Sequence, residues 1–212
     1  MSFKSTIFNK YFSSTVILGI ALVAPTVFSS NAMAATKTQN NKMFIKESSS
    51  QKIDLSKAIA QTPRVRKSTI NLIKHYEGFH STAYIDTHGL PLIGYGQSKI
   101  SGKRVKMGQY ISRSKADAEL EKELYKIQNL ILSKVKVKLT PNQLGALTSI
   151  TYNVGPGILT RSTLIRKLNA GDYAGAAREF PRWNKANQGG RLVPLAGLTR
   201  RRLAEQKLFL TP

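Results

Sequence analysis

The chain has 212 residues, with 33 Lys and Arg against 11 Asp and Glu, a formal net charge of +22, and no cysteine. The lack of cysteine excludes a disulfide scaffold and a thiol nucleophile, so the fold must depend on a hydrophobic core. The positive charge predicts attraction to polyanions, although a purely solubilising role is the alternative. No zinc-finger or RNP-type motif is present, so we expect no specific nucleic-acid partner.

The first 34 residues have the pattern of an export signal. Two lysines precede an uncharged, mostly apolar run over residues 15–28, and Ala34 ends a small-residue cleavage site. A retained membrane anchor is the alternative, but the run is short for a span and contains Pro25. We therefore expect residues 1–34 to be a signal peptide, no stable transmembrane anchor after its cleavage, and a periplasmic or secreted protein.

Residues 35–62 are rich in Lys, Asn, Gln, Ser and Thr and contain few large apolar side chains. This composition is typical of a flexible linker. Pro63 marks a plausible start for the folded part, and residues 63–212 are numerous enough to bury one domain core. We expect these residues to form the functional domain.

The start of this domain predicts a helix followed by a hairpin. Residues 65–79 carry apolar side chains at helical spacing, which predicts a helix with one buried face. Residues 83–85 and 92–95 favour two hairpin strands around a Gly-containing turn, and the segment 99–107 favours a third short strand.

The rest of the chain is predicted to be mostly helical. Ser112 is a suitable N-cap for a long helix with apolar residues from Ala116 to Ile131. The acidic residues of this helix alternate with lysines, which favours a solvated, ion-paired face. Further helices are expected after the cap-type residues Thr140, Ser162 and Asp172 and over residues 198–210. The fold class is therefore α+β, with a small β-hairpin lobe and a larger, mostly α-helical lobe.

Glu77 and Asp86 are the candidate catalytic residues. Glu77 lies near the end of the first predicted helix, and Asp86, after eight intervening residues, lies on the first arm of the hairpin. Two carboxylates at such a junction are the groups that acid–base cleavage of a glycosidic bond requires. The acid must be protonated when it meets the leaving oxygen, which burial favours, while its partner stays ionised. An ordinary surface position on a helix is the alternative for Glu77.

Other chemistries lack support in the sequence. His75, His80 and His88 do not have the spacing of metal ligands, and no G-x-S-x-G, Walker or dinucleotide-binding motif is present. We therefore expect neither a metal nor a cofactor.

Several segments resemble the phage-type lysozymes, the endolysins of glycoside hydrolase family 24. Their pattern has a Glu, eight residues, an Asp or Cys, and then I-G-Y-G, which Glu77, Asp86 and residues 93–96 match. Further matching segments lie at residues 139–143, 152–155, 162–173, 180–185 and 197–202. The resemblance covers about residues 65–212.

This resemblance implies a bilobal lysozyme fold that cleaves the β-1,4 bond between N-acetylmuramic acid and N-acetylglucosamine in peptidoglycan. It implies Glu77 as the general acid and Asp86 as the carboxylate that helps to position the attacking water, with inversion at the anomeric carbon. It also implies that Asn153 and the hairpin residues contact the saccharide, the latter being Gly94, Gly96 and Gln97.

Two positions depart from the family pattern. Leu92 stands where the family has a Thr, and Gln97 stands where it has a His. The resemblance implies that the Thr hydroxyl of the family shares the water with the Asp, and a Leu side chain can neither donate nor accept a hydrogen bond. Three hypotheses follow: an exported muramidase, a lysozyme-fold protein that binds glycan strands and cleaves them poorly, and a cationic agent that disrupts envelopes by charge. The expected partners are peptidoglycan glycan strands and anionic cell-envelope polymers.

Overall fold

The computed structural model describes residues 65–212. The signal peptide expected at residues 1–34, the linker expected at 35–62 and the domain start expected at 63 lie outside the described residues. Within residues 65–212, no helix combines the length and the apolar character needed to cross a membrane.

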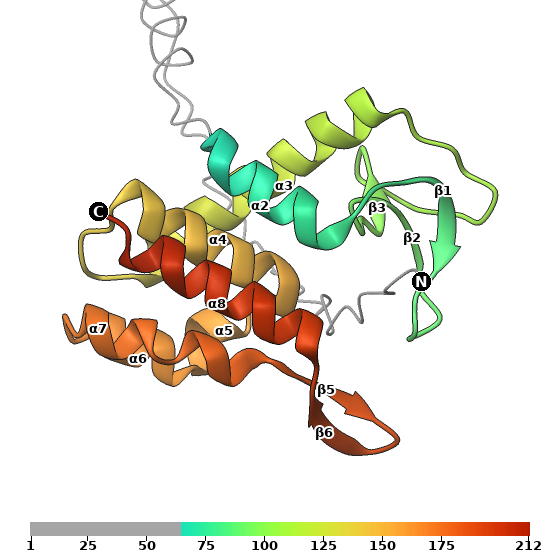
Figure 1. Cartoon of the computed structure of the whole chain (residues 1–212). Coiled ribbons are helices and arrows are strands. Elements are labelled where there is room, and N and C mark those ends of the chain that lie inside the picture. Colours follow the sequence, from blue (N-terminus) through green and yellow to red (C-terminus); the bar gives the residue numbers. More distant parts are fainter. Residues whose placement is uncertain (1–64) are drawn as a thin grey trace, which may run out of the picture. The chain divides into compact units, whose positions relative to one another are not determined.

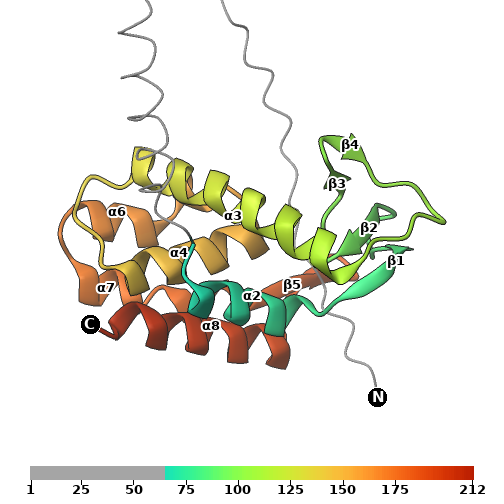
Figure 2. The same cartoon turned by 90° about the horizontal axis from the view of Figure 1, so that it is seen from above.

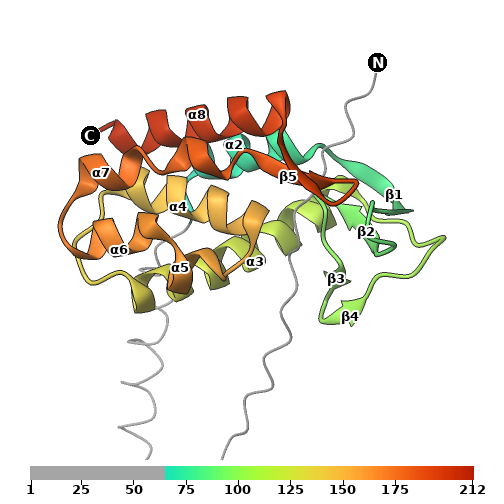
Figure 3. The same cartoon turned by 90° about the horizontal axis from the view of Figure 1, so that it is seen from below.

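Helix α4, Pro141–Val154, forms the centre of the helical lobe. Thr140 and Gln143 form a capping box at its start, and Gly155 ends it at a positive φ of 87°. All nine residues from 145 to 153 are buried, as is typical of a helix that is covered on every side. Its neighbours are α2 (Lys67–Glu77), α3 (Arg113–Lys134) and α8 (Ala196–Leu210), and Figure 3 shows α4 between α3 and α8.

Short helices complete the helical lobe. They are α5 (Ile158–Arg161), α6 (Thr163–Asn169), α7 (Tyr173–Ala177) and the 3₁₀ helix η1 (Phe180–Trp183). The predicted caps Ser162 and Asp172 accept hydrogen bonds from the backbone N–H groups of Ile165 and Gly175. Helix α5 was not predicted from the sequence. The helix expected after Asp172 forms as α7, and Pro181 lies near the start of the separate helix η1, where its missing N–H costs no hydrogen bond.

The small lobe contains two hairpins. Strand β1 (His80–Ile85) pairs antiparallel with β2 (Pro91–Gly94), and Tyr84 lies opposite Leu92. The single strand expected at 99–107 was wrong, because two short strands form there, β3 (Lys99–Ile100) and β4 (Lys103–Arg104). The residues between them have positive φ angles, Ser101 at 50° and Gly102 at 80°, and this conformation reverses the chain.

A third hairpin, absent from the sequence analysis, projects from the helical lobe (Figure 1). It consists of β5 (Lys185–Gln188) and β6 (Arg191–Pro194). Gly189 and Gly190 both have positive φ at the turn. This pair of glycines between two short runs was the available sequence signal for a hairpin.

Two hydrophobic cores give the fold its two lobes, and α3 contributes to both. Leu120 and Leu124 of α3 belong to the core beneath the small lobe, whereas Ile131 belongs to the core of the helical lobe. Ile127 packs against both cores. Figure 2 shows α3 running from the β-hairpins to the helical lobe. The expected α+β, bilobal architecture is therefore confirmed.

The acidic face of α3 forms ion pairs as expected, but two of its carboxylates are less solvated than expected. Asp117 accepts a hydrogen bond from the Tyr95 hydroxyl at 2.7 Å and lies 2.8 Å from Lys74 Nζ. Glu119 accepts hydrogen bonds from the backbone N–H and the hydroxyl of Ser101. These two carboxylates connect α3 to other elements, because the first half of the helix lies beside the small lobe.

Candidate active site

Glu77 is the last residue of α2, and its side chain is buried. Gly78 follows at a φ of 69°, which ends the helix immediately after the carboxylate. The Glu77 side chain is 2% exposed, and its Oε1 accepts a hydrogen bond of 2.8 Å from Nη1 of Arg201 on α8. Glu77 is therefore a buried, ion-paired residue at the junction with β1 and not an exposed helix residue.

A second carboxylate shares the guanidinium that holds Glu77. Arg201 Nε donates to Oε1 of Glu205 at 3.1 Å, and Arg201 Nη2 donates to the Ser149 carbonyl at 3.3 Å. The Ser149 hydroxyl donates to the same Glu205 oxygen at 2.7 Å. Burial alone would lower the pKa of Arg201, but the charges of Glu77 and Glu205 outweigh it and raise the pKa above its ordinary value.

Arg202 extends this network to Asn153. Its Nη2 donates to Asn153 Oδ1 at 3.0 Å and to Glu205 Oε1 at 3.1 Å. Its Nε lies 2.9 Å from Glu205 Oε2, although this contact lacks hydrogen-bond alignment and acts only through charge. Burial lowers the pKa of Arg202 to about 10 despite the charge of Glu205. Asn153 Nδ2 and Arg202 Nη1 are buried and have no hydrogen-bond partner within residues 65–212.

Only part of this network was predicted from the sequence. Glu77 and Asn153 were named as site residues, whereas Ser149, Arg201, Arg202 and Glu205, which connect the two, were not. Glu205 lies four residues after Arg201 and three after Arg202, so an ion pair along the helix was readable from the spacing. That the whole group is buried was not readable, because it depends on how α8 packs against α4.

Asp86 follows β1 and shapes the hairpin turn. Its Oδ1 accepts hydrogen bonds from the backbone N–H groups of His88 and Leu90, both at 2.8 Å. Its Oδ2 lies 3.6 Å from Nδ1 of His88, and the Asp86 side chain is 11% exposed. Glu77 and Asp86 share no hydrogen-bonding or ion-pairing residue in the described part of the chain. The two predicted carboxylates therefore lie in separate polar groups, one anchored to α8 and one within the hairpin.

The return arm of the hairpin is held by Gln97. The Gln97 side chain accepts a hydrogen bond from the Tyr95 N–H at 2.7 Å and donates to the Ala116 carbonyl at 3.3 Å. Gly94 has a φ of 67°, and a Cβ at this position would lie 2.3 Å from Gln97 Oε1. The next glycine, Gly96, also has a positive φ, of 83°. Leu92 is 1% exposed, so its side chain is part of the interior.

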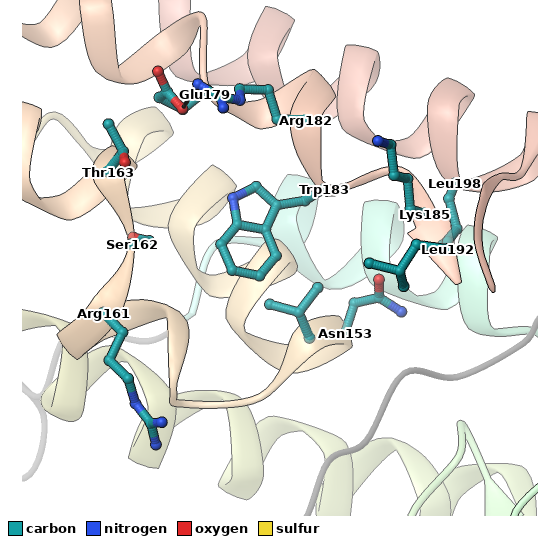
Figure 4. A pocket seen from close by; sticks show the side chains of 11 residues that line it. Asn153, Arg161, Ser162, Thr163, Glu179, Arg182, Trp183, Lys185, Leu192 and Leu198 are labelled. Atoms are coloured by element: carbon teal, nitrogen blue, oxygen red, sulfur yellow. Dashed lines mark hydrogen bonds and ion pairs between the residues drawn. The ribbon is translucent and has the colours of Figure 1, made fainter. Parts of the chain in front are cut away.

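A pocket of about 360 Å³ lies beside Asn153 (Figure 4). Figure 4 shows the Trp183 ring between the Asn153 side and the Ser162 side of this pocket. Val154, Leu192 and Leu198 add apolar surface. The charged groups that line it are Arg161, Glu179, Arg182 and Lys185. Asn153 thus connects the buried network of Glu77 to a space large enough for part of a ligand.

Glu179 pairs with two cations at one side of this pocket. Its carboxylate lies 2.6 Å from Lys167 Nζ and 3.2 Å from Arg182 Nη1. The hydrogen bond from Lys167 lowers the pKa of Glu179, which outweighs the effect of burial. Within residues 65–212, no group of three or more His, Asp or Glu lies together in a way that could hold a metal ion.

Comparisons with known proteins agree with this architecture. The family model for phage lysozyme matches residues 74–205. The endolysin of Acyrthosiphon pisum secondary endosymbiont phage 1 is 41% identical over 138 residues, which are 65% of this chain and 92% of that protein. The endolysin of Salmonella phage P22 is 35% identical over 149 residues, which are 70% of this chain and 99% of that protein.

A solved structure agrees with the sequence relatives. The endolysin from Escherichia coli O157:H7 phage FAHEc1 superposes with a TM-score of 0.65 at 36% sequence identity, covering 70% of this chain and 94% of that chain. The family resemblance inferred from the sequence is thereby confirmed. The chain belongs to the phage lysozyme family, whose members are glycoside hydrolases that act on peptidoglycan.

Proposed function

We propose that this protein is an exported muramidase that hydrolyses the β-1,4 bond between N-acetylmuramic acid and N-acetylglucosamine in peptidoglycan. The observation that carries this proposal is the buried Glu77 carboxylate, fixed by Arg201 at the junction between α2 and the β1–β2 hairpin. A carboxylate fixed in one position can meet the leaving oxygen without first losing side-chain freedom, which favours general acid catalysis.

Glu77 is proposed as the general acid, which requires it to carry a proton when substrate binds. Nη1 of Arg201 lies 2.8 Å from Oε1 of Glu77, and the Glu205 carboxylate pairs with the same guanidinium. This network of two carboxylates and two guanidinium groups holds the Glu77 carboxylate in one place, where it can meet the leaving oxygen.

Asp86 is proposed to position the attacking water. Its Oδ1 is occupied by two backbone N–H groups, which fix the plane of the carboxylate. Its Oδ2 accepts neither of those bonds and remains the oxygen that can accept from a water molecule. This role predicts inversion at the anomeric carbon, as expected from the family resemblance.

The proposed substrate contacts divide into two kinds. Asn153 Nδ2 has no hydrogen-bond partner in the described part of the chain, so we propose that it donates a hydrogen bond to a carbonyl oxygen of the substrate. Gly94 and Gly96 allow the glycan to approach the backbone closely. Gln97 is 2% exposed and uses both ends of its amide internally, so we assign it the role of holding that turn in shape.

The proposed location follows from the export signal, and the proposed partners follow from the net charge. The export signal proposed for residues 1–34 would deliver the domain to the periplasm or outside the cell, where peptidoglycan lies. The formal charge of +22 favours contact with anionic polymers of the envelope in addition to glycan strands.

The second candidate function is binding of glycan strands without efficient cleavage. Leu92 favours it, because its buried side chain offers no hydroxyl to help Asp86 hold a water. An imperfectly held water weakens general base catalysis, a contribution of roughly 10²–10⁴-fold in rate.

Fragment release from purified peptidoglycan by the wild type and by Leu92→Thr separates the two functions. The muramidase proposal expects wild-type protein to release soluble fragments with new reducing ends. Binding to sacculi without release by the wild type, together with release by Leu92→Thr, would support the second function and refute the first. Thermal unfolding of both proteins should accompany the assay, because Leu92→Thr also removes buried apolar surface.

A further inference from the structure

The β3–β4 hairpin and the loop after it carry an unusual group of exposed side chains, here called the basic hairpin surface: Lys99, Lys103, Arg104, Lys106, Met107 and Tyr110. Met107 is 55% exposed and Tyr110 is 69% exposed, and both lie within seven residues of Lys103, Arg104 and Lys106 in the sequence. None of the four cations has an ion-pair partner among the described residues. The surface thus combines uncompensated positive charge with exposed apolar groups.

The register of the hairpin places two of these charges against each other. Lys99 lies directly opposite Arg104 in the β3–β4 pairing. Like charges in opposite positions of a sheet destabilise the pair. An anion placed over the two residues would remove this repulsion, and no carboxylate among residues 65–212 forms an ion pair with either of them.

Within the described part of the chain, the carboxylate of Glu119 reaches the hairpin, but it binds the turn and not the cations. Glu119 on α3 accepts from the Ser101 N–H at 3.0 Å and from the Ser101 hydroxyl at 3.2 Å, and it is also paired with Lys115 and Lys122. This anchor fixes the tip of the hairpin against α3. The loop is fixed as well, because Ala83 N–H donates to the Gln109 carbonyl and Ile111 N–H donates to the Ser81 carbonyl. The cations and the apolar groups are therefore presented on a rigid support.

We propose that the basic hairpin surface docks on an anionic phospholipid membrane, with Met107 and Tyr110 entering the interface and the four cations contacting headgroup phosphates. Exposed apolar and aromatic side chains beside cations are the combination that interfacial membrane binding uses. A soluble polyanion would use the cations and leave Met107 and Tyr110 in water, so the apolar pair selects the membrane. Figure 2 shows β3 and β4 at the end of the small lobe that lies away from α8. Helix α8 carries Arg201, which anchors Glu77.

A single fluorescent label tests this proposal on the full chain. The protein has no cysteine, so Met107→Cys creates the only thiol for a polarity-sensitive dye. Vesicles of phosphatidylcholine with phosphatidylglycerol should shift the dye emission to the blue, and added salt should reverse the shift. Pure phosphatidylcholine vesicles and soluble polyphosphate should leave it unchanged.

A label at Leu132→Cys is the matched control. Leu132 is 55% exposed on the far part of α3, close in sequence to three exposed lysines at positions 134, 136 and 138. Its dye should not shift. An equal shift at both labels, a shift with pure phosphatidylcholine, or a shift with polyphosphate would each overturn the proposal, since each places the contact elsewhere or assigns another occupant.

Charge variants provide the second measurement. Lys103→Ser, Arg104→Ser and Lys106→Ser combined should weaken vesicle binding of the label at 107 by roughly 100-fold, about 5-fold per cation. The control triple variant Lys134→Ser, Lys136→Ser and Lys138→Ser loses the same net charge and should leave that binding within about 5-fold of the parent. Equal losses in the two triple variants would show that bulk charge alone drives binding and would overturn the proposal. Neither outcome depends on muramidase activity.

Discussion

Nη1 of Arg201 lies 2.8 Å from Oε1 of Glu77, and both side chains are 2% exposed. The pair connects α8, near the end of the chain, to the residue that ends α2. Breaking a buried ion pair on one side leaves the other charge without compensation, so this contact matters both for stability and for the proposed chemistry.

Arg201→Gln should destabilise the protein strongly, because Glu77 and Glu205 would lose their shared cation. The expected loss in the free energy of unfolding is about 3–5 kcal/mol, measured by urea denaturation at neutral pH. Arg200→Gln is the matched control, since Arg200 is exposed and should cost less than about 0.5 kcal/mol. A loss below about 1 kcal/mol for Arg201→Gln would contradict the assignment of a stabilising buried network.

Asn153→Asp tests the unpartnered amide next to the pocket. The substitution keeps an oxygen for Arg202 and removes the Nδ2–H donor. We expect kcat/KM on peptidoglycan fragments to fall by about 10-fold, because a substrate carbonyl would lose its donor. Stability should not decrease, since the new carboxylate lies beside a guanidinium. Unchanged kinetics with retained stability would show that the substrate does not contact Asn153.

Glu119 should make folding stability sensitive to acid. The backbone hydrogen bond from Ser101, supported by Lys115 and Lys122, lowers the pKa of Glu119 to about 2. Because the folded pKa is depressed, the stabilisation is fully present above the ordinary pKa of about 4.5 and is lost as the pH falls toward 2. Solvent screening of the contact leaves a contribution of about 1–2 kcal/mol.

Urea denaturation across this pH interval measures the contribution of Glu119. The wild type should lose about 1–2 kcal/mol more than Glu119→Gln on going from about pH 5 to about pH 2. Glu121→Gln is the control, since Glu121 is exposed on the same helix. Parallel pH dependence of the wild type and Glu119→Gln would contradict the anchoring role of Glu119.

Helix ends were predictable because their signals are local. Ser112, Thr140 and Ser162 each cap the helix expected after them, since a side-chain oxygen near the first free N–H groups is favourable in any tertiary setting. The β5–β6 hairpin was missed although Gly189 and Gly190 marked its turn. Its strands have no clear alternation of apolar and polar residues, because the hairpin projects from the helical lobe and buries little.

The site residues also divide into those that local sequence signals could predict and those that they could not. Glu77 and Asp86 were predictable from their spacing at a helix–hairpin junction, and their catalytic roles remain predictions. The burial of the Arg201–Glu205 group could not be predicted from charge patterns, because an ion pair along a helix is usually exposed. Here the packing of α8 on α4 buries it. Residues whose meaning depends on contacts between distant elements were therefore the ones that the sequence analysis missed.

The most direct test of the account compares Glu77→Gln with Glu119→Gln in release of soluble fragments from purified peptidoglycan. Both substitutions neutralise an ion-paired carboxylate that contacts another element, but only Glu77 is assigned to proton donation. The account predicts that Glu77→Gln lowers the rate by about 10²–10⁴-fold while Glu119→Gln stays near the wild type. Wild-type release that persists in a folded Glu77→Gln protein would contradict it.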